Sequence, residues 1–113
     1  MAVSIKHDEP LYQLLREGRI DEFNQRAAAG EPCDLTECDF RGLDLRGWKV
    51  DGLDLSGSYF RQADLRGVDF SGARLDGASI NGSKISGALF PKNISAAEIT
   101  LSLEHGTRIR CDD

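Results

Sequence analysis

Histidine is scarce in this chain of 113 residues, which has two histidines, His7 and His105, one near each end. No Ser-His-Asp or Cys-His arrangement can be placed from the sequence. Cys33 and Cys38 lie five residues apart with no histidine nearby, which is not the spacing of a metal site. The sequence therefore predicts no enzyme, with no catalytic residue, no cofactor and no metal.

Long apolar runs are also missing. The opening MAVSIKHDEPLYQ has no apolar stretch after a basic region, so no signal peptide is predicted, and no segment is long enough to cross a membrane. Three cysteines do not indicate a disulfide framework, and Cys33 and Cys38 are interpreted as reduced core residues. We expect a cytoplasmic protein, and we discount the glycosylation pattern Asn93-Ile94-Ser95.

An excess of basic charge is the third feature that the chain lacks. Its net charge is −5, to which residues 33–92 contribute −1 from nine acidic and eight basic residues. Residues 1–32 and 93–113 contribute −2 each. This distribution has no basic footprint for nucleic acid, so direct nucleic-acid binding is not expected.

What the chain does have is a repeat of five residues, which runs twelve times without a gap from Cys33 to Lys92. The blocks read CDLTE, CDFRG, LDLRG, WKVDG, LDLSG, SYFRQ, ADLRG, VDFSG, ARLDG, ASING, SKISG and ALFPK. The third place is always apolar, the first is small or apolar, and the last is Gly in nine of the twelve blocks. A fixed period of this kind is typical of a solenoid.

A period of five fits neither a helix nor a long strand. Apolar residues that fall two and then three apart suit a short extended segment followed by a turn, with Gly supplying the positive φ of a type II turn. If four blocks make one coil, residues 33–92 make three coils. The third-place residues, among them Phe40, Leu45, Phe60 and Leu65, should then form buried columns. Trp48 is expected to anchor the core beside the N-terminal segment.

These blocks resemble the pentapeptide-repeat family, whose pattern is a small residue, Asp or Asn, Leu or Phe, and two variable positions. The resemblance implies an all-β solenoid, a right-handed quadrilateral β-helix, with the first and third places inward. Asp fills the second place in six blocks, whereas Trp48 and Leu53 are large for a first place. The last block departs most from the pattern.

Helical caps are predicted at both ends of the repeats. In residues 1–32, Asp8 or Glu9 can begin one helix that Gly18 ends, and a second apolar stripe from Ile20 to Ala27 follows. The segment LLREGRIDEFNQRAAAG also faintly resembles an ankyrin helix pair, but a cap on the first coil is the preferred interpretation.

In residues 93–113, Ser95 and Glu98 fit a capping box, and Gly106 can close the helix that they begin. A tail from 107 to 110 can then return as an extended segment. Such a helix would cover the open edge of the third coil.

When residues twenty apart in the sequence are placed above one another, arginines come together on the surface. Arg41 aligns with Arg61, and Arg46 with Arg66. Like charges on adjacent segments need carboxylates or a bound anion nearby. Asp39, Asp44 and Asp64 can supply the carboxylates, which would leave a solvated and balanced face. The functional alternative is a partner-binding face for an acidic protein surface, made by Arg41, Arg46, Tyr59, Arg61 and Arg66.

The expected function is a non-catalytic protein-protein interaction or scaffold module whose partner the sequence does not identify. The family resemblance implies an alternative, a DNA mimic that binds gyrase, as quinolone-protection proteins do. Charge disfavours it: three coils span roughly 14 Å at strand spacing, over which duplex DNA carries on the order of eight negative charges. The repeats here carry a net −1.

The C-terminal end has more apolar surface than one short helix can hide on a single face. Leu101 points away from the stripe that Ile99 and Leu103 form. Either the returning tail covers Leu101, or a second copy does. We expect a homodimer through this end, because a two-fold interface buries an apolar patch against its own copy. Its candidate surface is made by Leu89, Phe90, Ile99, Leu101 and Leu103.

Overall fold

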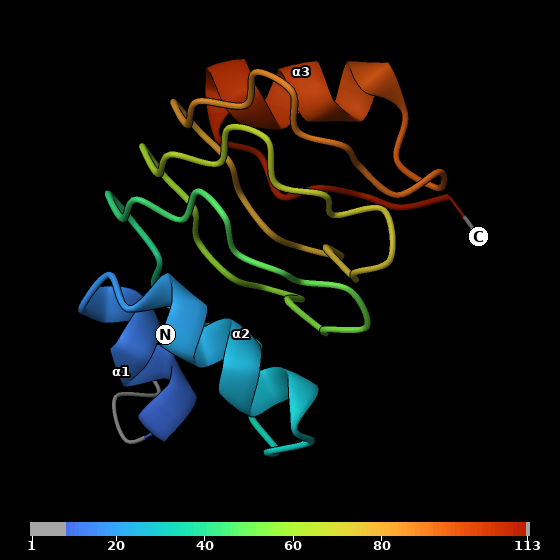
Figure 1. Cartoon of the computed structure of the whole chain (residues 1–113). Helices are drawn as coiled ribbons and strands as arrows, with labels where there is room; N and C mark the ends of the chain where they lie inside the picture. Colours follow the sequence, from blue (N-terminus) through green and yellow to red (C-terminus); the bar gives the residue numbers. More distant parts are fainter. Residues whose placement is uncertain (1–8, 113) are drawn as a thin grey trace.

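The computed structural model describes residues 9–112, and Figure 1 shows the chain winding between two helical ends. Helices α1 (Pro10–Arg16) and α2 (Ile20–Ala28) lie at one end, and α3 (Ala96–His105) lies at the other. These helices lie where the sequence predicted them. Asp8, the alternative start of α1, is outside the described residues, as is His7. Within the described part, no helix has the length and apolar character needed to span a bilayer.

Between the helices, residues twenty apart in sequence lie side by side. Isolated parallel bridges join Asp39 to Tyr59 and Tyr59 to Ser79, so the chain passes the same point three times. The N–H of Phe40 donates to the carbonyl of Tyr59 at 2.8 Å, and that of Phe60 donates to Ser79 at 2.7 Å. We call residues 33–52, 53–72 and 73–92 the first, second and third coils.

The predicted fold class, an all-β right-handed quadrilateral β-helix, is wrong. Residues 9–112 contain no β-strand, and their regular secondary structure is the three helices. Neighbouring coils are joined by isolated bridges of one residue on each side, as between Asp44 and Asp64. The physical reason is the block length: a turn follows every short extended segment, so no ladder of consecutive pairs can form.

A tight turn ends most blocks. The carbonyl of Leu65 accepts the N–H of Val68 at 3.1 Å, and the same bond recurs from block to block. Gly67 has φ 76°, as position three of a type II turn requires. Gly72 is the exception among the fifth-place glycines, because its φ is not positive. The repeated glycine therefore has a conformational role at Gly67 that it does not have at Gly72.

These two glycines should respond differently to alanine. We expect Gly67→Ala to lower the free energy of unfolding by about 1–2 kcal/mol, because a Cβ disfavours a left-handed residue. Gly72→Ala should stay within about 0.5 kcal/mol of the wild type, because its new methyl group would clash only with the exposed carboxyl group of Asp51, which can rotate away, while the Asp51 Cα lies at an ordinary contact distance of 3.8 Å. Urea unfolding of both variants measures the difference. Equal losses would contradict this account of the turn.

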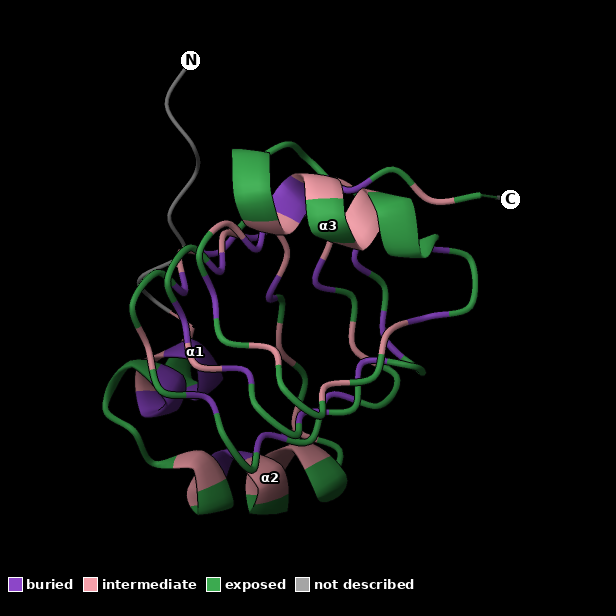
Figure 2. Cartoon of the chain, turned by 90° about the horizontal axis from the view of Figure 1, so that it is seen from above, coloured by how far each residue is buried: buried purple, intermediate pink, exposed green. Residues whose placement is uncertain are grey.

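The third places form the core, as predicted. They are buried from Leu35 to Ile80, and only Ile85 and Phe90 in the last two blocks are partly exposed. The rings of Phe40 and Phe60 stack with their centres 5.1 Å apart. The colours of Figure 2 show this alternation of buried and exposed residues along the coils.

Helices α1 and α2 close the first coil. Trp48 is 2% exposed and meets Phe23 of α2 edge to face at 5.8 Å, which confirms its predicted role as a core anchor. The Tyr12 hydroxyl of α1 donates to the carbonyl of Asp39 at 2.6 Å. Asn24 of α2 donates to the carbonyl of Gly47 at 2.9 Å. The helices therefore satisfy polar groups of this edge as well as covering apolar ones.

Helix α3 and the chain after it cover one half of the third coil. The Ser95 hydroxyl accepts the N–H of Glu98 at 3.1 Å, which confirms the predicted start of the helix. Ser102 is fully buried, and its hydroxyl accepts the N–H of Ile80 at 3.1 Å. Ile109 of the returning tail is also buried, and its N–H donates to the carbonyl of Ala78 at 2.8 Å.

The other half of the third coil has an open edge, which we define as residues 83–90. In the second coil, the N–H groups of Leu65, Gly67 and Phe70 donate to third-coil carbonyls at 2.8 to 3.0 Å. The equivalent N–H groups of the third coil find no acceptor within residues 9–112. They belong to Ile85, Gly87 and Phe90.

Candidate functional site: an arginine-lined face

An aspartate in the second place of a block stabilises its own turn. The carboxylate of Asp39 accepts the backbone N–H of Arg41 at 3.0 Å, and Asp44 accepts that of Arg46 at 3.2 Å. A carboxylate that accepts the N–H two residues later favours a turn. This local bond explains why aspartate recurs, and it places each carboxylate next to the fourth-place side chain.

Where the fourth place is arginine, the same aspartate forms a two-point ion pair. Nε and Nη2 of Arg41 lie 2.8 and 2.7 Å from the two carboxylate oxygens of Asp39. Arg66 contacts Asp64 in the same way at 2.9 and 2.7 Å. Two parallel contacts fix the orientation of the guanidinium as well as its position.

Arg46 and Arg66 lie in a group without net charge, which we call the balanced column, made by Asp44, Arg46, Asp64 and Arg66. Arg46 pairs with Asp44 at 2.7 Å, and its Nε also lies 3.4 Å from Oδ2 of Asp64. Two guanidinium groups thus face two carboxylates. This arrangement matches the solvated, balanced face that the sequence offered as the simpler interpretation.

The arginines of the balanced column lower the pKa of Asp64 to about 2. The main cause is the side-chain hydrogen bond from Arg66, and the backbone N–H of Arg66 and the charge of Arg46 act in the same direction. The carboxylate therefore stays ionised well below the pH at which an ordinary aspartate is protonated.

We expect the balanced column to lose its stabilising effect in acid. Because the folded-state pKa of Asp64, about 2, lies below its ordinary value of 3.8, the effect is present above roughly pH 4 and is lost as the pH falls toward about 2. The melting temperatures of the wild type and Asp64→Asn should therefore converge over that range. A difference that does not change with pH would contradict the assignment.

The neighbouring column is not balanced, because the block SYFRQ has Tyr59 in the second place, where six of the twelve blocks have aspartate. Arg61 therefore has no carboxylate two residues before it. Asp39, which lies beside Tyr59 in the first coil, is already paired with Arg41 at 2.7 Å. Arg61 is exposed, and the ion pairs within residues 9–112 do not include it.

Arg61 lines a surface hollow of about 430 Å³ with Arg41 and with Arg16, which comes from α1. We call it the arginine hollow. Its lining residues are Arg16, Asp39, Arg41, Gly42, Arg61 and Gln62. Three arginines and one aspartate line it, so the hollow carries a local positive charge on a chain whose net charge is −5.

Gln62 has an unusual backbone for its residue type. Its φ is 57°, and among the described residues Glu37 is the other non-glycine residue with positive φ. Its Cγ reaches over Gly82, 3.4 Å from where a Cβ would be. A left-handed conformation is unfavourable for a residue with a Cβ, and residues of this kind often occur at functional sites. Here the strained residue lies in the arginine hollow.

Tyr59 is covered by a residue from the C-terminal tail. The guanidinium of Arg108 lies 4.8 Å from the centre of the Tyr59 ring and also donates to the Tyr59 hydroxyl. A second donation, from Arg108 to the carbonyl of Gly77, is 2.7 Å long. Tyr59 was predicted to lie in the partner-binding face, and the structure places this additional cation against it.

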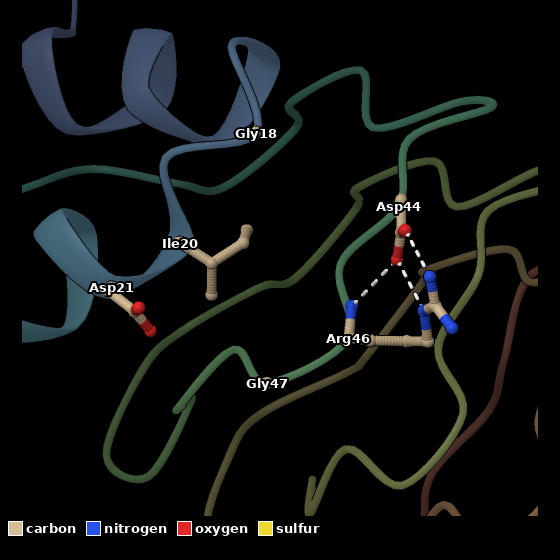
Figure 3. Close-up of a pocket in the computed structure, with 6 residues that line it drawn as sticks. All are labelled: Gly18, Ile20, Asp21, Asp44, Arg46 and Gly47. Carbon is tan, nitrogen blue, oxygen red and sulfur yellow. Dashed lines mark hydrogen bonds and ion pairs between the residues drawn. The ribbon is translucent and has the colours of Figure 1, made fainter.

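Figure 3 shows another hollow, of about 510 Å³, between the start of α2 and the first coil. Its charged residues are Asp21, Asp44 and Arg46, and the dashed lines show that Asp44 already binds Arg46. Two carboxylates and one occupied guanidinium leave no positive charge for an acidic ligand. This hollow therefore does not extend the arginine-lined face.

Sequence reasoning missed Arg16, Gln62 and Arg108. Only Gln62 had a signal in the sequence, since its block is one of three that do not end in Gly. Arg16 and Arg108 reach the face because α1 and the tail fold back on the coils, and no local pattern encodes those contacts.

The described residues contain no cluster of three or more His, Cys, Asp or Glu side chains that could hold a metal ion. Cys33, Cys38 and Cys111 are free thiols. Burial raises the pKa of Cys111 to about 11, and its contact with Asp76 acts in the same direction. Such a thiol is protonated at neutral pH and is a poor nucleophile.

The residues of the predicted dimer surface differ in exposure. Leu89 is 56% exposed, and Phe90 is partly buried against Phe70 with ring centres 5.8 Å apart. Ile99 and Leu103 pack against the core of their own chain, whereas Leu101 is partly exposed and does not. The homodimer stays a prediction.

The second and third coils match a known family model. Residues 54–90 fit the model of pentapeptide repeats, in eight copies. No curated protein and no solved structure matches the chain.

Proposed function

This chain is a pentapeptide-repeat protein, and from that premise we propose that it is a non-catalytic interaction module that holds its arginine hollow against an acidic region of another protein. The observation that carries the proposal is the contrast between two neighbouring columns. Arg46 and Arg66 have carboxylate partners at 2.7 Å, whereas Arg61 has none within residues 9–112. A cation without a local partner is available to a ligand.

The arrangement of the hollow supports this use. Arg41 is already oriented by its two contacts with Asp39, so little side-chain freedom is lost when it binds. Arginine is the preferred cation at protein interfaces because its planar fork matches carboxylate and phosphate groups. The coils and α1 that carry these side chains are joined by buried contacts such as that of Tyr12 with Phe40, at 5.6 Å between ring centres.

The test separates the two columns. Extracts of the native cell are passed over immobilised wild type, over Arg16→Gln/Arg61→Gln, and over the matched control Arg46→Gln/Arg66→Gln. Both double variants remove two positive charges, so only their positions differ. We expect proteins retained by the wild type to be lost with the first variant and kept with the second. Equal retention by all three, with unchanged melting temperatures, would overturn the proposal.

The gyrase alternative leads to a separate prediction. We expect the purified protein neither to inhibit gyrase nor to protect it from a quinolone at micromolar concentration. The repeats carry a net charge of only −1, and their arginine hollow has the wrong sign for a DNA mimic. A supercoiling assay with and without the quinolone measures both effects. Inhibition or protection at that concentration would favour the DNA mimic that binds gyrase over the interaction module.

A further inference from the structure

We propose that the arginine hollow is an oxyanion site that takes a phosphoryl dianion, either on a phosphorylated side chain or as a free phosphate group. This inference rests on the proposed function, because it names the group by which the acidic partner is recognised. Its support comes from the charge of the lining residues, from the three segments that carry the donors and from the strained residue in the hollow.

The charge of the hollow favours a dianion over a single carboxylate. The hollow is lined by the cations Arg16, Arg41 and Arg61 and by one carboxylate, that of Asp39. Since that carboxylate offsets one guanidinium, the hollow keeps two positive charges. A phosphomonoester carries about −1.5 to −2 at neutral pH, whereas a carboxylate carries only −1. A single carboxylate would therefore leave one guanidinium of the hollow unneutralised.

The donors also come from separate parts of the chain. Arg16 belongs to α1, Arg41 to the first coil and Arg61 to the second coil. A planar carboxylate is matched by the fork of one arginine, whereas a tetrahedral phosphoryl group has three terminal oxygens that accept from several directions. Three arginines on three segments suit the second geometry.

Existing bonds leave donors available in the hollow. Arg41 uses Nε and Nη2 to bind Asp39, so its other N–H groups remain for a ligand. Arg16 contacts the Tyr12 hydroxyl only at 3.4 Å, which is a long bond. Binding an oxyanion would thus not require a strong ion pair to break.

Gln62 adds an independent observation. Its φ of 57° is a conformation that the repeat usually assigns to Gly, yet a glutamine with an amide side chain occupies it at the hollow. An unfavourable φ of this kind favours a role for the glutamine side chain over a role in the turn. A neutral amide can donate to the oxyanion without adding charge.

The experiment measures binding to the full chain by isothermal titration at low ionic strength. The ligands are inorganic phosphate, sulfate, acetate and a short phosphoserine peptide with its unphosphorylated and aspartate counterparts. We expect phosphate, sulfate and the phosphopeptide to bind, and acetate and the two control peptides to bind about tenfold more weakly or not at all. A phosphopeptide tighter than phosphate identifies a modified side chain as the source, and the reverse order identifies a free phosphate group.

Variants assign the binding to the hollow. Arg61→Gln should weaken phosphate binding by about tenfold or more, whereas Arg66→Gln in the balanced column should change it less than about twofold. Gln62→Gly relieves the backbone strain, so it should raise the melting temperature while weakening phosphate binding.

Three results would overturn the oxyanion site: no binding of any dianion, acetate binding as tightly as phosphate, or equal losses with Arg61→Gln and Arg66→Gln. If the dianions do not bind but Arg16→Gln/Arg61→Gln still abolishes partner capture, the interaction module stands and only the phosphoryl assignment fails. If dianions bind but capture is unaffected, the hollow is an oxyanion site that the captured partner does not use, and the proposed function fails instead.

Discussion

Phe60→Ala is expected to lower the free energy of unfolding by about 3–5 kcal/mol, as is typical for a buried aromatic side chain. Phe60 is fully buried in the middle coil. Its ring centre lies 5.1 Å from Phe40, 6.1 Å from Phe70 and 6.4 Å from Trp48. The Phe60 ring therefore packs against aromatic rings of the first coil and of its own coil, and its removal would leave a cavity in the core.

Phe90→Ala is the matched control for this prediction. It removes the same side chain from the third coil, where Phe90 is partly exposed and stacks on Phe70 alone among the described rings. We expect a clearly smaller loss, because less apolar area is removed from water there. Urea unfolding of both variants gives the comparison. A loss below about 0.5 kcal/mol for Phe60→Ala would show that its inward assignment is wrong.

The period of five was enough to predict which residues are buried, but it did not predict the secondary structure correctly. Burial follows from spacing, since each third-place residue meets its equivalent twenty residues later. Strand formation depends on consecutive pairs between neighbours, and the turn at each block interrupts them, as between Asp39 and Asp44. The same sequence feature therefore supports the core and prevents the ladder.

The arginine-lined face was predictable only in part. The pairs of Arg41 with Asp39 and of Arg66 with Asp64 follow from a local pattern, two residues apart, that the sequence displays directly. The arginine hollow instead depends on where α1 places Arg16. That position results from packing of Tyr12 and its neighbours, and tertiary packing of this kind leaves no mark in the local sequence.

The C-terminal end provides the other large expected effect. Helix α3 and the tail bind the half of the third coil before Ser83, whereas the N–H groups of Ile85, Gly87 and Phe90 in the open edge have no acceptor within residues 9–112. Exposed edges with free N–H groups tend to pair with another chain. Leu89 lies on this edge and is 56% exposed. Leu101 on α3 adds a second apolar side chain that its own core does not cover.

We therefore expect the protein to be a two-fold dimer through this end, because a two-fold interface buries an apolar patch against its own copy. Light scattering at high micromolar concentration should give twice the monomer mass for the wild type. Leu101→Glu and Leu89→Glu should give the monomer mass, since each would bury a charge in the interface. Thr100→Glu, an exposed position on the same helix, is the control and should remain dimeric.

Hydrogen exchange adds a local measure of the same interface. The amides of Ile85 and Gly87 should be protected in the wild type and should exchange rapidly in the monomeric variants. A wild type that stays monomeric at that concentration would contradict the dimer.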